Sequence, residues 1–154
     1  MKKLIISIFV GFVLIQFFRP HKNTSTKVLE NAIEKHYTVP ENVSAIMKIS
    51  CYDCHSNNTI YPWYNNVQPF GWWLNYHVND GKRHLNFDEF NAYSTQKKKK
   101  KLEEIVETVE RKEMPLSSYT LIHTDAKLTT EQRQKIIAWA NRVKKNLNSK
   151  QDLN

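Results

Sequence analysis

Glycine is scarce in this chain, with only 3 in 154 residues. A sandwich of β-strands needs many tight turns and a phosphate-binding loop needs clustered glycines, so the sequence argues against both. No stretch alternates between apolar and polar residues with a period of two, and no internal repeat is visible. Apolar residues recur instead at helical spacing. The sequence therefore predicts an all-α fold with long loops, of a size that suits one domain.

Acidic residues are also in the minority. The chain has 15 of them against 23 lysines and arginines, which gives a formal net charge of +8. A charge of this sign favours association with acidic partner proteins or anionic surfaces. It does not identify any chemistry, for which motifs are needed.

The N-terminus contains a long apolar run over residues 4–18, preceded by Lys2 and Lys3 and followed by Arg19. A cleaved signal peptide and a retained anchor both fit this pattern. Signal cleavage needs small residues after the apolar core, however, and the residues here are bulky. Residues 1–18 would form a helix of ~27 Å, which is close to the thickness of a bilayer core. We therefore expect residues 1–19 to be an uncleaved membrane-spanning helix.

This helix would fix the location of the rest of the chain. Basic residues next to a span stay in the cytoplasm, so Lys2 and Lys3 would lie there. The expected location is the bacterial inner membrane, crossed once, with the remaining chain in the periplasm. Nucleic acid is not an expected partner in that compartment.

The remaining chain divides into a linker, a domain and a tail. Residues 20–39 read as a polar linker with a short helix carrying Val28, Leu29 and Ile33; residues 40–148 form the domain, and residues 149–154 the tail. Capping residues and apolar spacing predict helices from Pro40 to Cys51, over 71–79, over 87–93, from Thr95 to Met114, and from Thr129 or Thr130 to Leu147. A turn is expected after residue 79, and residues 56–70 read as a long loop.

Both cysteines of the chain lie in one short motif, Cys51-Tyr52-Asp53-Cys54-His55. This is the C-x-x-C-H spacing of c-type haem attachment. Two thiols three residues apart on one helical turn can both bond to the vinyl groups at one edge of a porphyrin. The adjacent imidazole then becomes an axial ligand of the iron. The motif predicts one covalently attached haem c.

Three other uses of the two cysteines remain open. A redox dithiol of the thioredoxin type needs a βαβ context, which the sequence does not show. A structural zinc site needs four ligands and would have to recruit two histidines besides Cys51 and Cys54. A disulfide within C-x-x-C is strained and rare as a structural element.

The sixth position of the iron has two candidate ligands and a third possibility, an open distal face. Met114 precedes Pro115 near a helix end, and a thioether ligand would raise the reduction potential. His77 is the alternative, on a helix with Trp72, Trp73 and Tyr76. His123 follows Met114 closely enough to hydrogen-bond to a haem carboxylate or to the ligand loop.

A cluster of aromatic residues and a run of lysines suggest what surrounds the haem and which partners the protein binds. Aromatic residues concentrate between Tyr61 and Tyr76, where they would exclude water around a haem or simply form an ordinary core. The lysine run at residues 97–101 reads either as a solvated helix face or as a docking surface for an acidic redox partner.

Further motifs accompany the cysteines along the chain. They are the motif itself followed by Ser56-Asn57, then Tyr61-Pro62-Trp63-Tyr64, Trp72-Trp73 with His77, Leu85-Asn86-Phe87, Met114-Pro115, Tyr119, His123, Leu128 and Trp139. Together they resemble the haem-binding domain proteins of Bacteroidetes and related bacteria, which are relatives of c-type cytochromes. The resemblance covers residues 40 to 145. It implies a small cytochrome c-like helical domain, with His55 on one side of the iron and Met114 as the second ligand. Family members often have two prolines after this methionine, whereas Leu116 follows Pro115 here.

These observations combine into one expected function and two alternatives. We expect a membrane-anchored periplasmic c-type haem protein that carries single electrons and is not an enzyme. The first alternative is a haem peroxidase or a gas or redox sensor with an open distal site. The second is a thiol or zinc protein without haem.

Overall fold

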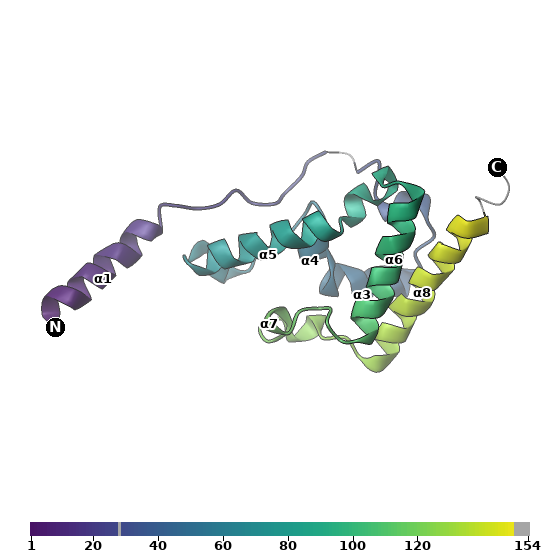
Figure 1. The fold of residues 1–154 in the computed structure, drawn as a ribbon. Coiled ribbons are helices and arrows are strands. Elements are labelled where there is room, and N and C mark those ends of the chain that lie inside the picture. The colour runs from purple at the N-terminus through teal and green to yellow at the C-terminus, as the bar shows by residue number, and fades with distance from the viewer. Residues whose placement is uncertain (28, 150–154) are drawn as a thin grey trace.

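The structure is a computed structural model that describes residues 1–27 and 29–149, and these contain no β-strand. The elements are α1 (Lys2–Ile15), α2 (Ile33–His36), α3 (Glu41–Ser50), α4 (Tyr52–His55), η1 (Trp63–Asn66), α5 (Phe70–His84), η2 (Phe87–Ala92), α6 (Thr95–Glu110), α7 (Ser117–Thr120), η3 (Thr124–Ala126) and α8 (Thr130–Ser149), where η denotes a 3₁₀-helix (Figure 1). The predicted all-α fold is confirmed.

The N-terminal helix is shorter than the apolar run that contains it. Helix α1 has 14 residues, which corresponds to ~21 Å against the ~30 Å of a bilayer core. It ends before Gln16, whose side chain both donates to the carbonyl oxygen of Gln68 (3.1 Å) and accepts from the backbone N–H of Gln68 (2.8 Å). Within the described residues, no helix has the length and apolar character needed to cross a membrane.

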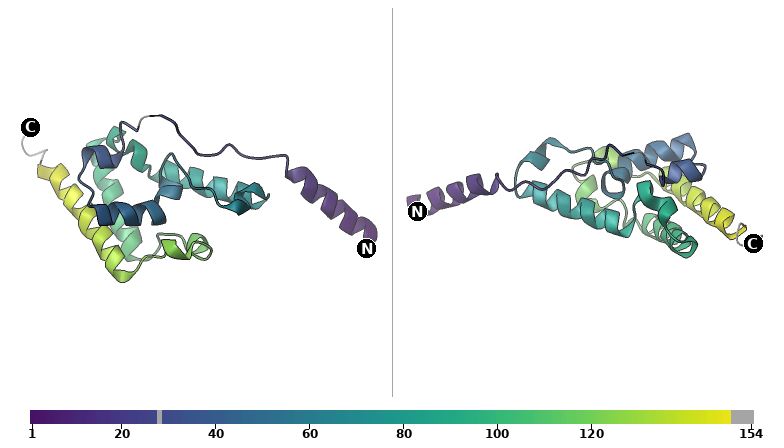
Figure 2. Two further views of the ribbon diagram at one scale, coloured as in Figure 1. Left: turned by 180° about the vertical axis from the view of Figure 1, so that it is seen from behind. Right: turned by 90° about the horizontal axis from the view of Figure 1, so that it is seen from above.

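The prediction of a membrane-spanning helix at residues 1–19 is therefore wrong. The predicted single-pass inner-membrane location, which depended on that helix, is wrong with it. The error arose because the whole run up to Phe18 was counted as one helix. In the structure α1 projects from the packed helices, and an extended segment joins it to them (Figure 2).

The core is formed mainly by α3, α6 and α8, with α6 and α8 side by side (Figure 1). Leu102, Ile105 and Val109 of α6 supply one apolar stripe. The facing stripe of α8 consists of Ile136, Trp139, Ala140, Val143 and Leu147. The helical spacing of these residues is what places them on one face of each helix. Their burial fixes the frame against which the remaining helices pack.

Helix α5 extends further than its sequence predicts. The expected turn after residue 79 is absent, and α5 continues through Gly81 to His84. A Cβ atom on Gly81 would lie 2.6 Å from the carbonyl oxygen of Cys54. Glycine is thus needed here for the close approach of two helices, α4 and α5, rather than for a turn.

The other predicted elements agree with the structure in most places. Asn86 caps η2, because its side chain accepts from the backbone N–H of Asp88. Helix α6 begins at Thr95 as expected, with Ser94 as its N-cap. The short helix expected in the linker corresponds to α2, which contains Ile33 but begins after Leu29, so the predicted helix starts too early. Val28, which was assigned to that helix, lies outside the described residues, as do residues 150–154 of the expected tail.

Candidate functional site

The C-x-x-C-H motif lies at the junction of α3 and α4. Helix α3 ends at Ser50. Cys51 has a non-helical backbone conformation, and α4 then carries Cys54 and His55. Both thiols are free and partly buried. The α4 helix packs against α3 and α5, so its side chains are held between the two.

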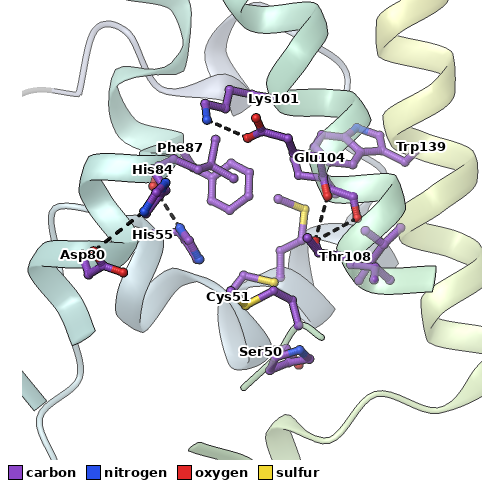
Figure 3. Close-up of a pocket in the computed structure, with 17 residues that line it drawn as sticks. Ser50, Cys51, His55, Asp80, His84, Phe87, Lys101, Glu104, Thr108 and Trp139 are labelled. Atoms are coloured by element: carbon purple, nitrogen blue, oxygen red, sulfur yellow. Dashed lines mark hydrogen bonds and ion pairs between the residues drawn. The ribbon is translucent and has the colours of Figure 1, made fainter. Parts of the chain in front are cut away.

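Two adjoining cavities open beside the motif, with volumes of about 370 and 150 Å³. Both are lined by Ser50, Cys51, His55, Asp80, His84, Met114 and Pro115. In the larger one, His55 and His84 lie on one side, Thr108 and Trp139 on the other, and Lys101 opposite Cys51 (Figure 3). The two cavities form one cleft between the motif, α5 and the α6–α8 pair.

The cleft brings together all five residues predicted for the site. Cys51, His55 and Met114 line both cavities. Cys54 and His77 line only the smaller one. The assignment of Cys51, Cys54 and His55 as haem-binding residues, and of Met114 or His77 as sixth ligand, stays a prediction.

The imidazole of His55 has a defined tautomer. Its Nδ1 lies 2.9 Å from the carbonyl oxygen of Leu85, and because a carbonyl only accepts, Nδ1 carries the proton. In the neutral ring, Nε2 is then the basic nitrogen, free to bind a metal. Burial lowers the pKa of His55, against the opposing effect of the Leu85 and Gly81 carbonyl groups. The ring is therefore neutral at pH 7, in the protonation state of a ligand.

The two thiols have the opposite character to a redox dithiol. Burial raises the pKa of Cys51 to about 12, with a contribution from the nearby Cys54. Burial also raises the pKa of Cys54 to about 11, and the charge of Asp53 adds to this effect. A reactive dithiol of the thioredoxin type needs a lowered pKa. This interpretation of the motif therefore has no support in the structure.

The interpretation of the motif as part of a structural zinc site also lacks support in the described residues. Across residues 1–27 and 29–149, no group of three or more His, Cys, Asp or Glu side chains is arranged to hold a metal ion. A tetrahedral zinc site needs four such ligands. The disulfide interpretation does not match either, since both cysteines are free.

The methionine is presented by a sharp turn at the end of α6. Lys112 adopts a left-handed conformation (φ 61°), which ends the helix. The backbone N–H of Met114 then donates to the carbonyl oxygen of Thr108 (3.1 Å), and Arg133 of α8 donates to the carbonyl oxygen of Met114 (3.2 Å). The backbone of Met114 is thus tied to both α6 and α8.

Several residues of the cleft were not anticipated from the sequence: Asp53, Asp80, His84, Lys101 and Glu104. Asp80 and His84 follow His77 at i+3 and i+7, so they share its helix face. This spacing could have predicted that they line the same cavity as His77. Lys101 carries a side chain that is only 12% exposed and pairs with Glu104 at 2.6 Å. Within a run of five lysines nothing in the sequence distinguishes it.

The aromatic segment contributes less than expected. None of the aromatic residues between Tyr61 and Tyr76 lines either cavity. Tyr64 is buried, whereas Trp63 and Tyr76 are largely exposed. Phe87 and Trp139 in the larger cavity and Tyr119 in the smaller one are the aromatic residues of the cleft instead. His123, which we expected near a haem carboxylate or the ligand loop, has its Nε2 2.8 Å from the hydroxyl of Tyr64.

Comparison with known proteins agrees with this site. No curated protein and no solved structure matches the chain. A family model described as a haem-binding domain matches residues 10–142, which include the motif, the cleft and most of α8. This match spans most of the chain, and the chain belongs to the haem-binding domain family.

Proposed function

We propose that this haem protein holds one covalently attached haem c and carries single electrons. Cys51 and Cys54 would form the two thioether bonds, and His55 would be the proximal ligand. The observation that carries the proposal is the His55 imidazole, which is neutral, oriented by Leu85 and directed into a cleft beside two free thiols.

The residues of the cleft fit a haem. The group is large, flat and apolar, and side chains such as Met47, Leu85, Phe87, Ile105 and Val109 line the larger cavity. The donor set is also suitable, because an imidazole and a thioether both line the cleft together with the thiols. When bound, a haem supplies one-electron transfer at its iron.

The protein's own residues have three tasks in this mechanism. The carbonyl oxygen of Leu85 orients the His55 ring and increases its basicity as a ligand. The apolar lining excludes water, which favours the less charged oxidation state of the iron. Lys101 is the lysine that lines the larger cavity, so it is suited to pair with a carboxylate of the haem.

Met114 is the better supported of the two candidate sixth ligands. It lines both cavities, whereas His77 lines only the smaller one. A methionine ligand gives the higher reduction potential. If His77 or no residue took the position, the ferrous protein would differ in potential or bind carbon monoxide, as a peroxidase or sensor does.

The lysine run is proposed as the docking site for an acidic redox partner. Some of its charges are already engaged, because Lys97 lies over the ring of Tyr93 and Lys101 pairs with Glu104. Lys100 has an exposed side chain (73%) that lies 3.9 Å from Glu104. Association through such a surface should weaken as salt is added.

A haem-peroxidase stain after a denaturing gel tests covalent attachment. The chain is fused to a cleavable export signal and coexpressed with haem-attachment machinery, because c-type haem is attached outside the cytoplasm. The matched control replaces Cys51 and Cys54 by alanine. We expect a stained band only with both cysteines present. An unstained band from exported protein with intact cysteines would refute the c-type assignment.

A further inference from the structure

The segment from Met114 to His123 packs loosely against the rest of the molecule. It contains α7, which lies apart from the packed helices (Figure 1). The side chains of Leu121 and Ile122 at its far end are 80% and 57% exposed. Apolar burial therefore contributes little to holding this segment across the cleft.

Two side-chain hydrogen bonds connect this segment to the side of the cleft that carries the motif. The hydroxyl of Tyr119 donates to Oδ2 of Asp53 at 2.8 Å. Nε2 of His123 lies 2.8 Å from the hydroxyl of Tyr64. The rings of Tyr119 and His123 are stacked, with centroids 4.3 Å apart and planes within 16°. The two contacts therefore reinforce each other.

Asp53 is a fixed anchor for this connection. It stands between the two cysteines, and its Oδ1 accepts from the backbone N–H of Ile60 at 2.9 Å. Its carbonyl oxygen accepts from the hydroxyl of Thr59 at 2.7 Å. Both the carboxylate and the backbone of Asp53 are thus held by contacts that do not involve Tyr119.

Tyr119 lies close to Met114 along the chain, with Pro115 stiffening the connection. Asp53, Met114 and Tyr119 all line the smaller cavity. The rival ligand His77 lines the same cavity. The contact between Tyr119 and Asp53 therefore lies beside the smaller cavity, which both candidate sixth ligands line.

We propose that Tyr119 is a positioning residue, whose hydrogen bond to Asp53 holds the 114–123 segment across the cleft and keeps Met114 at the haem iron. The inference rests on the proposed function, because it requires a haem with Met114 as a ligand. The physical basis is that a neutral donor bonded to a carboxylate makes one of the stronger hydrogen bonds in proteins. Without it, the segment is still held at its two ends, by the backbone bonds of Met114 and by the contact of His123 with Tyr64, but the stretch between them loses its bond to the motif.

The test uses Tyr119→Phe in the haem-loaded protein. This change removes one hydroxyl and retains the ring stacked on His123. We expect weaker methionine-to-iron charge transfer in the ferric spectrum, a lower reduction potential, and carbon monoxide binding to the ferrous form about tenfold faster, because the loss of a charge-assisted hydrogen bond favours the open segment. Tyr37→Phe is the matched control, since Tyr37 packs on Phe90 away from both cavities.

A double-mutant cycle with Met114→Ala separates positioning from a general structural role. If Tyr119 acts through Met114, Tyr119→Phe changes neither the potential nor carbon monoxide binding in the Met114→Ala background. An equal effect in both backgrounds overturns the inference, as does a Tyr119→Phe protein that behaves like the unaltered one.

The same cycle distinguishes a failure of the proposed function. If Met114→Ala alone leaves the spectrum and carbon monoxide binding unchanged, Met114 is not the ligand and the positioning role falls with it. Absence of the haem stain in the unaltered protein would refute the covalent haem itself. Asp53→Ala gives an independent check, because it removes the carboxylate that accepts from the Tyr119 hydroxyl and should reproduce the effect of Tyr119→Phe.

Discussion

The His55 ring and the Leu85 carbonyl group are joined by a hydrogen bond of 2.9 Å from Nδ1 to the backbone oxygen. Leu85 immediately follows α5, and His55 is the last residue of α4. The bond therefore links the end of the motif to the end of the helix beside it. It fixes both the tautomer and the direction of the ring, and it does so without a titratable partner.

Acid should destabilise the haem-free protein through His55. The folded state lowers the pKa of His55 below its ordinary value of 6.5. At pH values between the folded-state pKa and the unfolded-state pKa, the unfolded chain therefore binds more protons than the folded one. Stability is retained above the unfolded pKa and decreases as the pH falls below it, by at most about 1.4 kcal/mol per pH unit. Urea midpoints measured from pH 8 to pH 5 should show this slope. His55→Gln should reduce the slope, and an unchanged slope would contradict the prediction.

Gly81→Ala should disturb the packing of α4 on α5. The added Cβ atom would meet the Cys54 carbonyl oxygen at 2.6 Å and its Cβ at 3.0 Å, so the helices must separate. Overpacking of this kind costs about 1–3 kcal/mol. We expect a lower thermal midpoint and weaker haem staining. Gly11→Ala is the matched control, because nothing lies within 4 Å of its added Cβ.

Lys101→Gln should lower the reduction potential of the haem-loaded protein. A positive charge in the lining of the cavity disfavours the ferric state, and its removal should shift the redox free energy by on the order of 1 kcal/mol. Lys100→Gln removes the same charge from a side chain that is 73% exposed, so its effect should be smaller. Glu104→Gln should raise the potential. Spectroelectrochemical titration measures all three, and equal shifts for Lys100 and Lys101 would contradict the assigned location.

The thiols of the haem-free protein should react slowly with iodoacetamide. Alkylation requires the thiolate, and burial raises the pKa of Cys51 to about 12 and of Cys54 to about 11. At pH 8 the folded protein should be alkylated about a hundredfold more slowly than the urea-unfolded chain. Mass spectrometry over time gives both rates. Rapid labelling of one thiol in the folded state would revive the redox-dithiol interpretation.

Local sequence signals determined most of the helical architecture. The apolar spacing in residues 102–109 and 136–147 specified the buried faces of α6 and α8, because a helix places residues three and four apart on one side. The C-x-x-C-H motif placed two thiols and an imidazole within one short stretch. The family match, over residues 10–142, agrees with the haem that this motif predicts.

Only the tertiary structure decided which distant side chains meet. No periodicity relates Asp53 to Tyr119, or distinguishes Lys101 from its four lysine neighbours, because these positions depend on how α4, α6 and the 114–123 segment are arranged. Likewise, Gly81 reads as a turn residue until the approach of Cys54 is known. The apolar N-terminal run has the composition of a span, yet its helix ends before Gln16, whose side chain bonds to Gln68, 52 residues further along. Composition and spacing report the local preference of a segment, whereas its length as a helix and its partners depend on contacts that the linear pattern does not encode.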